Sequence, residues 1–211
     1  MNSLTNIFIM LRNTPLFGFL ILVIAALCFS CATTTLSGTW KDEGYGGQPQ
    51  KIIVIMAAKT PEMRKLFEGR FVAELRARGN RAIQSSESIS LEQLHDKELV
   101  KSRLKSSGAD TVLISRLIDS KTTAAYVSGK VHIVPDSYYE WGTFYDAVFF
   151  EQGYTGNTQL SYVETNLYDI ASEKLIWSAQ SKTERTEGEQ QLITAFIDVI
   201  LRKLSSDRII K

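Results

Sequence analysis

The feature that most restricts this chain is an uninterrupted apolar run, LFGFLILVIAALCFSC, which spans Leu16 to Cys31. Its first fourteen residues carry no charge, and Arg12 is the one charged residue that precedes it. A helix that crosses a bilayer needs about 20 apolar residues, whereas the apolar core of a secretory signal needs about 7 to 15. The length of the run therefore predicts a signal peptide over residues 1–30, with Met10 as an alternative first residue.

The end of this run resembles a bacterial lipobox. Ser30 is small, as the residue before a signal-peptidase cut must be, and Cys31 follows it. In such a motif the cysteine thiol takes a diacylglycerol and becomes the new N-terminus, so the resemblance implies a lipoprotein with palmitate-type acyl chains on Cys31. Several acyl chains anchor a protein stably. Ala32 after the cysteine favours the outer membrane. The alternative is an uncleaved anchor helix with an ordinary thiol at Cys31.

The composition after the leader excludes several kinds of site. Residues 1–30 contain one of the 24 basic residues and none of the 23 acidic ones, so the remaining chain has no net charge. A neutral chain does not attract a phosphate backbone, and we expect no nucleic-acid partner. Both cysteines, Cys28 and Cys31, lie at the leader. We therefore expect no disulfide, no zinc–thiolate site and no cysteine nucleophile in the folded part. We also expect no cofactor and no other metal site.

The chain after the leader divides into two parts by composition. Residues 31–50 are small, polar and glycine-rich, which predicts a flexible lipidated tether. Trp40 and Tyr45 are exceptions that we expect to pack this tether onto the domain, with an aromatic at the membrane interface as the alternative. Residues 51–211 are predicted to form a single periplasmic α/β domain.

Apolar runs and helical spacing predict the elements of this domain. Lys51–Ala57 and Thr111–Ile118 are continuous apolar runs, typical of strands covered on both faces. Helices are predicted from Thr60 to Gly79, from the capping box Ser90–Gln93 to about Lys105, and from Gly188 to about Ser206. Further strands are predicted at Ala82–Ser85, at Ala124–Val134, and at Leu160–Ile170 and Lys174–Thr183, the last two as a hairpin. The predicted fold is a two-layer α/β (α+β) sandwich with a mixed sheet of five to six strands and three helices, in the order β-α-β-α-β-β-β-β-α.

Residues 135–159 interrupt this pattern with an aromatic-rich insertion. Eight of the 17 aromatic residues that follow the leader lie here: Tyr138, Tyr139, Trp141, Phe144, Tyr145, Phe149, Phe150 and Tyr154. A long segment without regular structure is usually functional or disordered, and a high aromatic content argues against disorder. Tyr, Trp and Phe are also the residues that binding hot spots and bilayer interfaces use. We therefore expect an interaction surface, with a hairpin that covers the edge of the sheet as the alternative.

The sequence lacks the motifs of the common catalytic sites. It has no Gly-x-Ser-x-Gly elbow, no phosphate-binding loop and no His-Glu-x-x-His motif. The two histidines, His95 and His132, are isolated, and we expect neither to bind metal or to act in catalysis. We therefore expect a protein that is not an enzyme. The alternative is a hydrolase that uses carboxylates such as Glu164 and Asp169.

Short motifs along the chain resemble a group of uncharacterised bacterial outer-membrane lipoproteins. They are Trp40-Lys41-Asp42, Lys51–Val54, Phe67-Glu68, Arg78-Gly79, Gly108-Ala109-Asp110 before Val112–Ile114, and Glu164–Asp169 with Leu175–Ala179. The layout is also similar to that of the curli-export lipoprotein periplasmic domain and the TolB N-terminal domain. The resemblance implies a place in the cell envelope and no catalytic residue, but similarity of fold does not fix function.

These observations predict a non-enzymatic, lipid-anchored cell-envelope protein. It would act as a binding or assembly module at the periplasmic side of the outer membrane, through a protein partner or self-association. The alternative is a subunit of an oligomeric export or secretion assembly, in which the aromatic segment reaches the bilayer or a neighbouring protomer.

Overall fold

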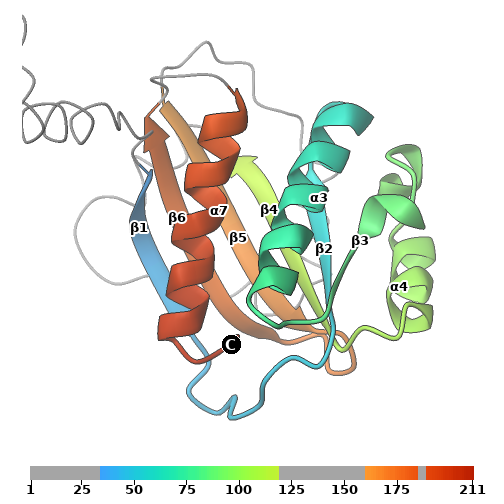
Figure 1. Cartoon of the computed structure of the whole chain (residues 1–211). Coiled ribbons are helices and arrows are strands. Elements are labelled where there is room, and N and C mark those ends of the chain that lie inside the picture. The colour runs from blue at the N-terminus through green and yellow to red at the C-terminus, as the bar shows by residue number, and fades with distance from the viewer. Residues whose placement is uncertain (1–33, 119–159, 185–188) are drawn as a thin grey trace, which may run out of the picture. The chain divides into compact units, whose positions relative to one another are not determined.

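A computed structural model describes residues 34–118, 160–184 and 189–211, which form a mixed six-stranded sheet with three α-helices (Figure 1). The strands are β1 (Thr34–Lys41), β2 (Ile52–Ala57), β3 (Ala82–Gln84), β4 (Thr111–Ile118), β5 (Leu160–Asp169) and β6 (Leu175–Glu184), and the helices are α3 (Pro61–Ala77), α4 (Lys97–Ser106) and α7 (Glu189–Ser206). The strand order is β1-β6-β5-β4-β2-β3, with β2 parallel to β3 and β4 and the other pairs antiparallel. This open α+β arrangement confirms the predicted fold class.

Strand β1 corrects the prediction that residues 31–50 are a flexible tether. Thr34–Lys41 pairs with β6 at the edge of the sheet, from Thr34 opposite Thr183 to Lys41 opposite Trp177. An edge strand is bonded on one side and partly exposed, so it does not need the apolar run of a central strand. The polar composition of this segment is therefore compatible with a strand, although it led to the prediction of a tether.

The two aromatic residues of this segment pack as predicted. Trp40 lies half-buried against the apolar cluster that contains Ile53 and Ile55. Tyr45 lies half-buried against the second cluster, which contains Trp177. The two side chains thus pack on opposite faces of the sheet, and they keep the chain between β1 and β2 close to the domain.

The first strand–helix unit forms as its sequence predicts. Five consecutive residues of β2, Ile52–Met56, are buried, because helices cover this part of the sheet on both faces. Thr60 caps α3, and its side chain accepts a hydrogen bond from the backbone N–H of Met63 at 3.3 Å. Gly79 lies just beyond the end of the helix with a φ of 79°, which a residue without a Cβ adopts at low cost.

Helix α4 begins later than predicted. The capping box of Ser90 and Gln93 is present: Gln93 N–H donates to Ser90 Oγ at 3.3 Å, and Ser90 N–H donates to Gln93 Oε1 at 2.9 Å. It opens a single 3-10 turn, Glu92–His95, because Asp96 then adopts an extended backbone and caps the next helix through Leu99 N–H at 3.0 Å. Two successive caps compete in the sequence, and the second one starts the α-helix.

The C-terminal half contains the predicted hairpin and the predicted last helix. Strands β5 and β6 are antiparallel and joined by a short turn, in which Glu173 has a φ of 61°, a left-handed conformation that glycine adopts most readily. Helix α7 buries the predicted apolar stripe of Ile193, Phe196, Ile197, Ile200 and Leu204, and Leu192 is half-buried. The strand predicted at Ala124–Val134 lies outside the described residues.

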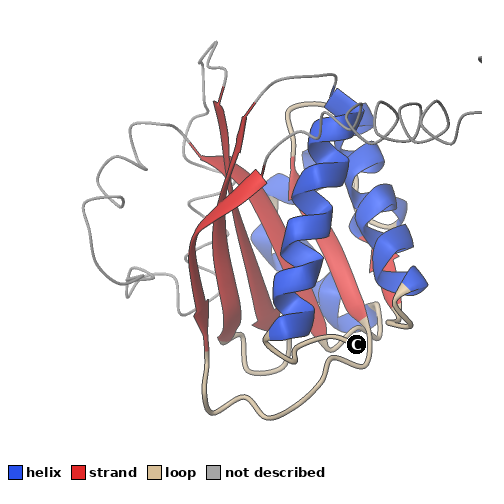
Figure 2. Cartoon of the chain, turned by 60° about the vertical axis from the view of Figure 1, so that its left-hand side comes forward, coloured by secondary structure: helices blue, strands red, loops and turns tan. Residues whose placement is uncertain are grey.

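Helices α3 and α7 lie side by side over one face of the sheet (Figures 1 and 2). The rings of Phe67 on α3 and Phe196 on α7 have their centroids 5.5 Å apart. Helix α4 covers the opposite face, where Val100 and Leu104 pack against Ile53 and Ile55 of β2. At β2 the sheet is therefore covered by α3 on one face and by α4 on the other. Helix α4 is a layer in addition to the two that were predicted.

Candidate functional site

The residues that we expected to carry function lie mainly outside the described residues. These are the lipid-attachment residue Cys31 and the eight aromatic residues from Tyr138 to Tyr154. Their roles stay predictions. His132, for which we expect no functional role, also lies outside the described residues. The aromatic insertion 135–159 joins the described fold through β4 and β5.

The two carboxylates named for a hydrolase do not converge. Glu164 lies on β5, and its Oε2 pairs with Arg116 Nε at 2.9 Å. Asp169 ends the same strand five residues later, where its Oδ1 accepts hydrogen bonds from Ser172 N–H at 2.6 Å and from its hydroxyl at 2.7 Å. Five residues of strand span about 17 Å, which is too far for two carboxylates that share one reaction. The structure therefore does not support the alternative in which Glu164 and Asp169 form a catalytic pair.

A row of polar side chains lies on the sheet face that α4 partly covers. Arg116, Glu164 and Asn166 belong to it, because alternate residues of β4 and β5 point to this face. Asn166 Nδ2 donates to Glu164 Oε1 at 3.4 Å and to the hydroxyl of Tyr168 at 3.2 Å. Glu164 is 4% exposed and Asn166 is fully buried. We refer to these four residues as the polar row.

The polar row is a buried hydrogen-bonded network on this face of the sheet. The carboxylate of Glu164 is buried and pairs with Arg116, so it has little access to a substrate. One acceptor is unused: Asn166 Oδ1 is buried without a hydrogen-bond partner. The row could have been found from the alternation of Glu164, Asn166 and Tyr168 in the sequence, because a period of two places them on one face.

A second polar cluster, on α3, is structural. Arg64 and Glu68 form an ion pair at 2.9 Å with side-chain exposures of 2% and 0%. The remaining guanidinium nitrogens of Arg64 donate to the carbonyl of Ile89 at 2.8 Å and to Ser85 Oγ at 2.7 Å. Because every charged atom has a partner and none faces solvent, this cluster joins elements and does not present a binding site. The sequence signal for it was an i,i+4 charge pair beside the apolar stripe of the helix.

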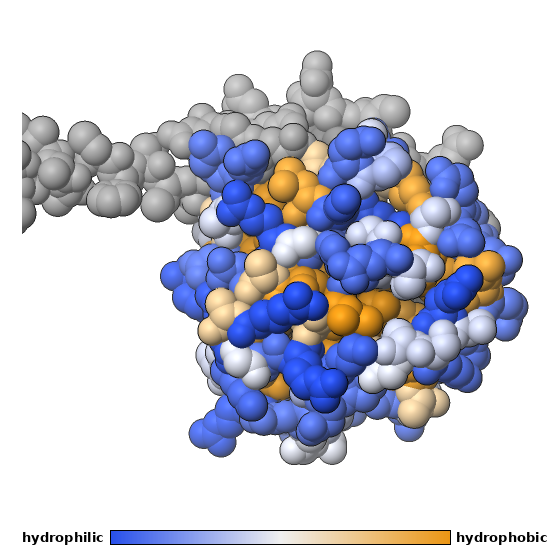
Figure 3. Space-filling view, turned by 45° about the vertical axis from the view of Figure 1, so that its right-hand side comes forward, coloured by the Kyte–Doolittle hydropathy of each residue, from blue (hydrophilic) through white to orange (hydrophobic). Residues whose placement is uncertain are grey.

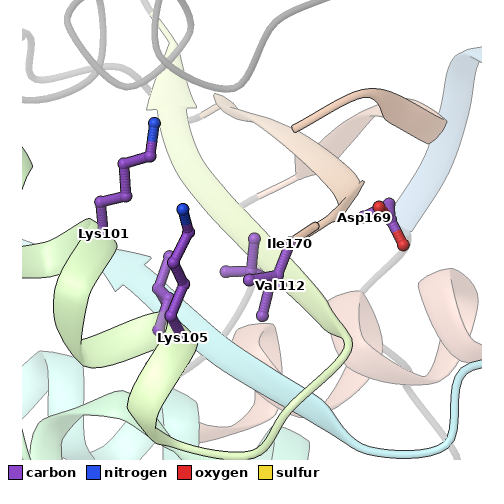
Figure 4. A pocket seen from close by; sticks show the side chains of 6 residues that line it. Lys101, Lys105, Val112, Asp169 and Ile170 are labelled. Carbon is purple, nitrogen blue, oxygen red and sulfur yellow. The ribbon is translucent and has the colours of Figure 1, made fainter. Parts of the chain in front are cut away.

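The hollow beside α4 is too small for an organic ligand. It is lined by the stems of Lys101 and Lys105 and by Val112 and Ile170, with Asp169 at its side (Figure 4). Its volume is about 10 Å³, which is the space of roughly one water molecule. Lys101 forms an ion pair with Glu173, and this hydrogen bond raises the pKa of Lys101. The hollow therefore carries no chemistry of its own.

The described residues contain no other arrangement typical of a metal or membrane-spanning site. Within ranges 34–118, 160–184 and 189–211, no three His, Cys, Asp or Glu side chains gather in the geometry of a metal site. His95 lies exposed at the end of its 3-10 turn. None of the helices described combines the length and apolar composition that crossing a bilayer requires. On the side of α3 and α4, hydrophilic side chains break the apolar surface into small areas (Figure 3).

Comparison with known proteins gives a weak likeness of fold. No protein-family model and no curated protein matches the chain. Among solved structures, the chain is similar to the PelC dodecamer from Paraburkholderia phytofirmans, with a TM-score of 0.46, 16% identity, and coverage of 82% of this chain and 97% of that chain. A single-substitution variant of the same dodecamer gives a TM-score of 0.44 and 15% identity at the same coverage. Similarity at this level carries no argument about function.

Proposed function

We propose that this chain is a lipid-anchored cell-envelope protein that binds or assembles protein partners at the periplasmic side of the outer membrane, and that it is not an enzyme. One observation carries the proposal. The apolar leader ends at Cys31, and Thr34, the first residue of β1, follows three residues later.

The short link between the cysteine and the sheet explains why an anchor matters for this domain. Three residues span at most about 11 Å, whereas a flexible segment of 20 residues would reach about 25 Å on average. Because β1 is hydrogen-bonded to β6 from its first residue, an acyl chain on Cys31 would hold the folded body itself close to the membrane. Such a protein works where it is anchored.

The pairing of the described charges supports a binding role over catalysis. Glu164 is neutralised by Arg116, and Glu68 is neutralised by Arg64 in a buried cluster. A hydrolase needs a carboxylate or nucleophile that is accessible and has a pKa matched to proton transfer. The carboxylate of the polar row is instead buried and paired with Arg116 within the sheet.

The test is the chemical state of the mature N-terminus. We expect intact mass spectrometry of membrane-extracted protein to show the loss of residues 1–30 and a diacylglycerol-modified Cys31. Cys31→Ser should abolish the modification and release the protein from the membrane fraction, whereas the matched variant Cys28→Ser should behave as wild type. An unmodified sulfur at Cys31 in the wild-type protein would contradict the proposal.

A second candidate is a subunit of an oligomeric export or secretion assembly, and the edge strand β1 favours it. β1 is eight residues long and pairs with β6 on one side, and no described strand pairs with its other side. An open edge of this length can add a strand from another chain. Native mass of the lipidated protein in detergent tests this candidate, and a monomer would exclude it.

A further inference from the structure

We infer that one end of the sheet, the anchor end, contacts the lipid bilayer, and this inference rests on the lipid proposed at Cys31. At the anchor end, β1 and β5 begin, β2, β4 and β6 end, and the helices α3 and α7 have their N-termini. In that order the residues are Thr34, Leu160, Ala57, Ile118, Glu184, Pro61 and Glu189. Strand register places these positions together, with Thr34 opposite Thr183 and Leu160 opposite Glu184. Ala57 lies opposite Arg116, two residues before the end of β4.

The other end of the sheet is far from these residues. It carries the end of β1 at Lys41, the turn between β5 and β6, and the C-terminal end of α4 (Figure 1). Strand β5 has ten residues, and a strand rises about 3.3 Å per residue, so the two ends lie about 30 Å apart. A membrane contact at one end is therefore distinguishable from a contact at the other.

Chain length selects the anchor end. Cys31 is separated from Thr34 by three residues, which span at most about 11 Å. That reach is about a third of the distance between the two ends of the sheet. An acyl group on Cys31 at the bilayer surface therefore brings the anchor end to the membrane, whatever direction the link takes.

The described surface at the anchor end has a feature that fits this contact. Leu117 is 37% exposed and is the large apolar side chain that the described residues leave most open to solvent. It lies one residue before the end of β4, at the anchor end. An exposed leucine alone has little meaning, but here it lies at the end that chain length already selects.

The chain between β4 and β5 is attached at the same end. Ile118 precedes residues 119–159 and Leu160 follows them. Those residues include the eight aromatic side chains of the predicted interaction surface, and Tyr and Trp are enriched at bilayer interfaces. The point of attachment therefore agrees with the orientation that the anchor requires.

The experiment uses single cysteines in the full lipidated protein. Cys28 leaves with the leader and the sulfur of Cys31 is bonded to lipid, so an introduced cysteine is the one free thiol. Glu62→Cys and Gln190→Cys place a fluorophore at the anchor end, and Ala171→Cys and Ser106→Cys place it at the opposite end. All four positions are exposed. The protein is reconstituted in phosphatidylethanolamine–phosphatidylglycerol vesicles that contain a lipid with a nitroxide on its headgroup.

We expect the two anchor-end labels to lose most of their fluorescence and the two opposite labels to keep it. Equal quenching at both ends would mean that the domain lies flat on the bilayer, and stronger quenching at the opposite end would reverse the orientation; either result overturns the inference. Flotation of each labelled protein with the vesicles shows whether the lipid anchor holds the protein on the membrane, independently of the quenching. Wild-type protein that does not float would overturn the proposed function and the inference with it, whereas floating protein with the wrong quenching pattern overturns the inference alone.

Discussion

Arg64 Nε lies 2.9 Å from Glu68 Oε1 in the interior of the domain, one turn apart on α3. The carboxylate of Glu68 also accepts hydrogen bonds from Met56 N–H at 3.0 Å, from Ser85 Oγ at 2.8 Å and from Ser86 N–H at 2.8 Å. One buried carboxylate thus joins the helix to β2 and to the segment after β3. This relationship makes α3 a fixed part of the sheet.

Removing one partner of this pair should destabilise the domain strongly. Glu68→Ala leaves the Arg64 charge buried without a counter-ion, which typically costs about 3–5 kcal/mol. Urea unfolding of the protein without its leader measures the change. The matched control is Glu74→Ala on the same helix: Glu74 pairs with Arg78 but is 49% exposed, so we expect a loss below about 1 kcal/mol. Equal effects of the two variants would contradict the buried cluster.

Strand β1 should be required for folding. A chain that begins at Asp42 lacks the strand that pairs with β6 and the contact of Lys41 Nζ with the backbone carbonyl of Asp207, at 2.8 Å. We expect this truncation to lower the melting temperature sharply or to prevent folding. As a control, two glycines inserted between Gly46 and Gly47 lengthen an exposed loop and should cost below about 1 kcal/mol. A truncated chain as stable as the full domain would restore the flexible-tether interpretation.

Asp207 should stabilise the end of α7 through a buried indole. Trp177 is fully buried, and its Nε1–H donates to Asp207 Oδ2 at 2.8 Å, while Lys203 Nζ lies 2.7 Å from Oδ1. Asp207→Ala leaves the indole donor without this acceptor, and we expect a loss of about 1–3 kcal/mol. Unfolding followed by tryptophan fluorescence measures it. Asp198→Ala, which removes the more exposed pairs with Arg202 and Arg78, should change stability little.

Tyr45 should make stability fall at alkaline pH. Burial, followed by the nearby charges of Asp110 and Asp169, raises the pKa of Tyr45 above its ordinary value of 10.0. The folded state therefore keeps this proton at a pH where the unfolded state has lost it. The resulting stability is present below about pH 10 and is lost as pH rises through the folded pKa.

The measurement for Tyr45 is a pair of unfolding curves. Between pH 9 and pH 11, on either side of the ordinary tyrosine pKa of about 10, wild-type protein should lose more stability than Tyr45→Phe, because the variant has no phenol to ionise. Other tyrosines titrate equally in both proteins and cancel in the difference. Parallel curves for the two proteins would show that folding does not shift the pKa of Tyr45.

Local sequence signals located most of the elements correctly. The apolar run of β2, the cap at Thr60, the left-handed position of Gly79 and the alternation in β5 each depend on neighbours within a few residues. Such signals are visible without knowing the fold. The beginning of α4 was wrong because two caps, Ser90 and Asp96, offered equally good local starts.

The candidate site was less accessible to sequence reasoning. The polar row could be read from alternation within β5, but its pairing of Arg116 with Glu164 depends on the register of β4 against β5. The ion pair of Arg64 and Glu68 looks like an exposed helix pair in the sequence. It is buried because Ser85 and Ile89, far along the chain, close over it.

The sequence by itself determined the central strands and the two long helices, because apolar periodicity and capping residues act over short distances. The leader that ends at Cys31 stays a prediction from the sequence. Only the tertiary structure decided that Thr34–Lys41 is a strand and that it begins at one particular end of the sheet. The physical reason is that an edge strand is held by its partner, here β6 about 140 residues later, and not by its own composition.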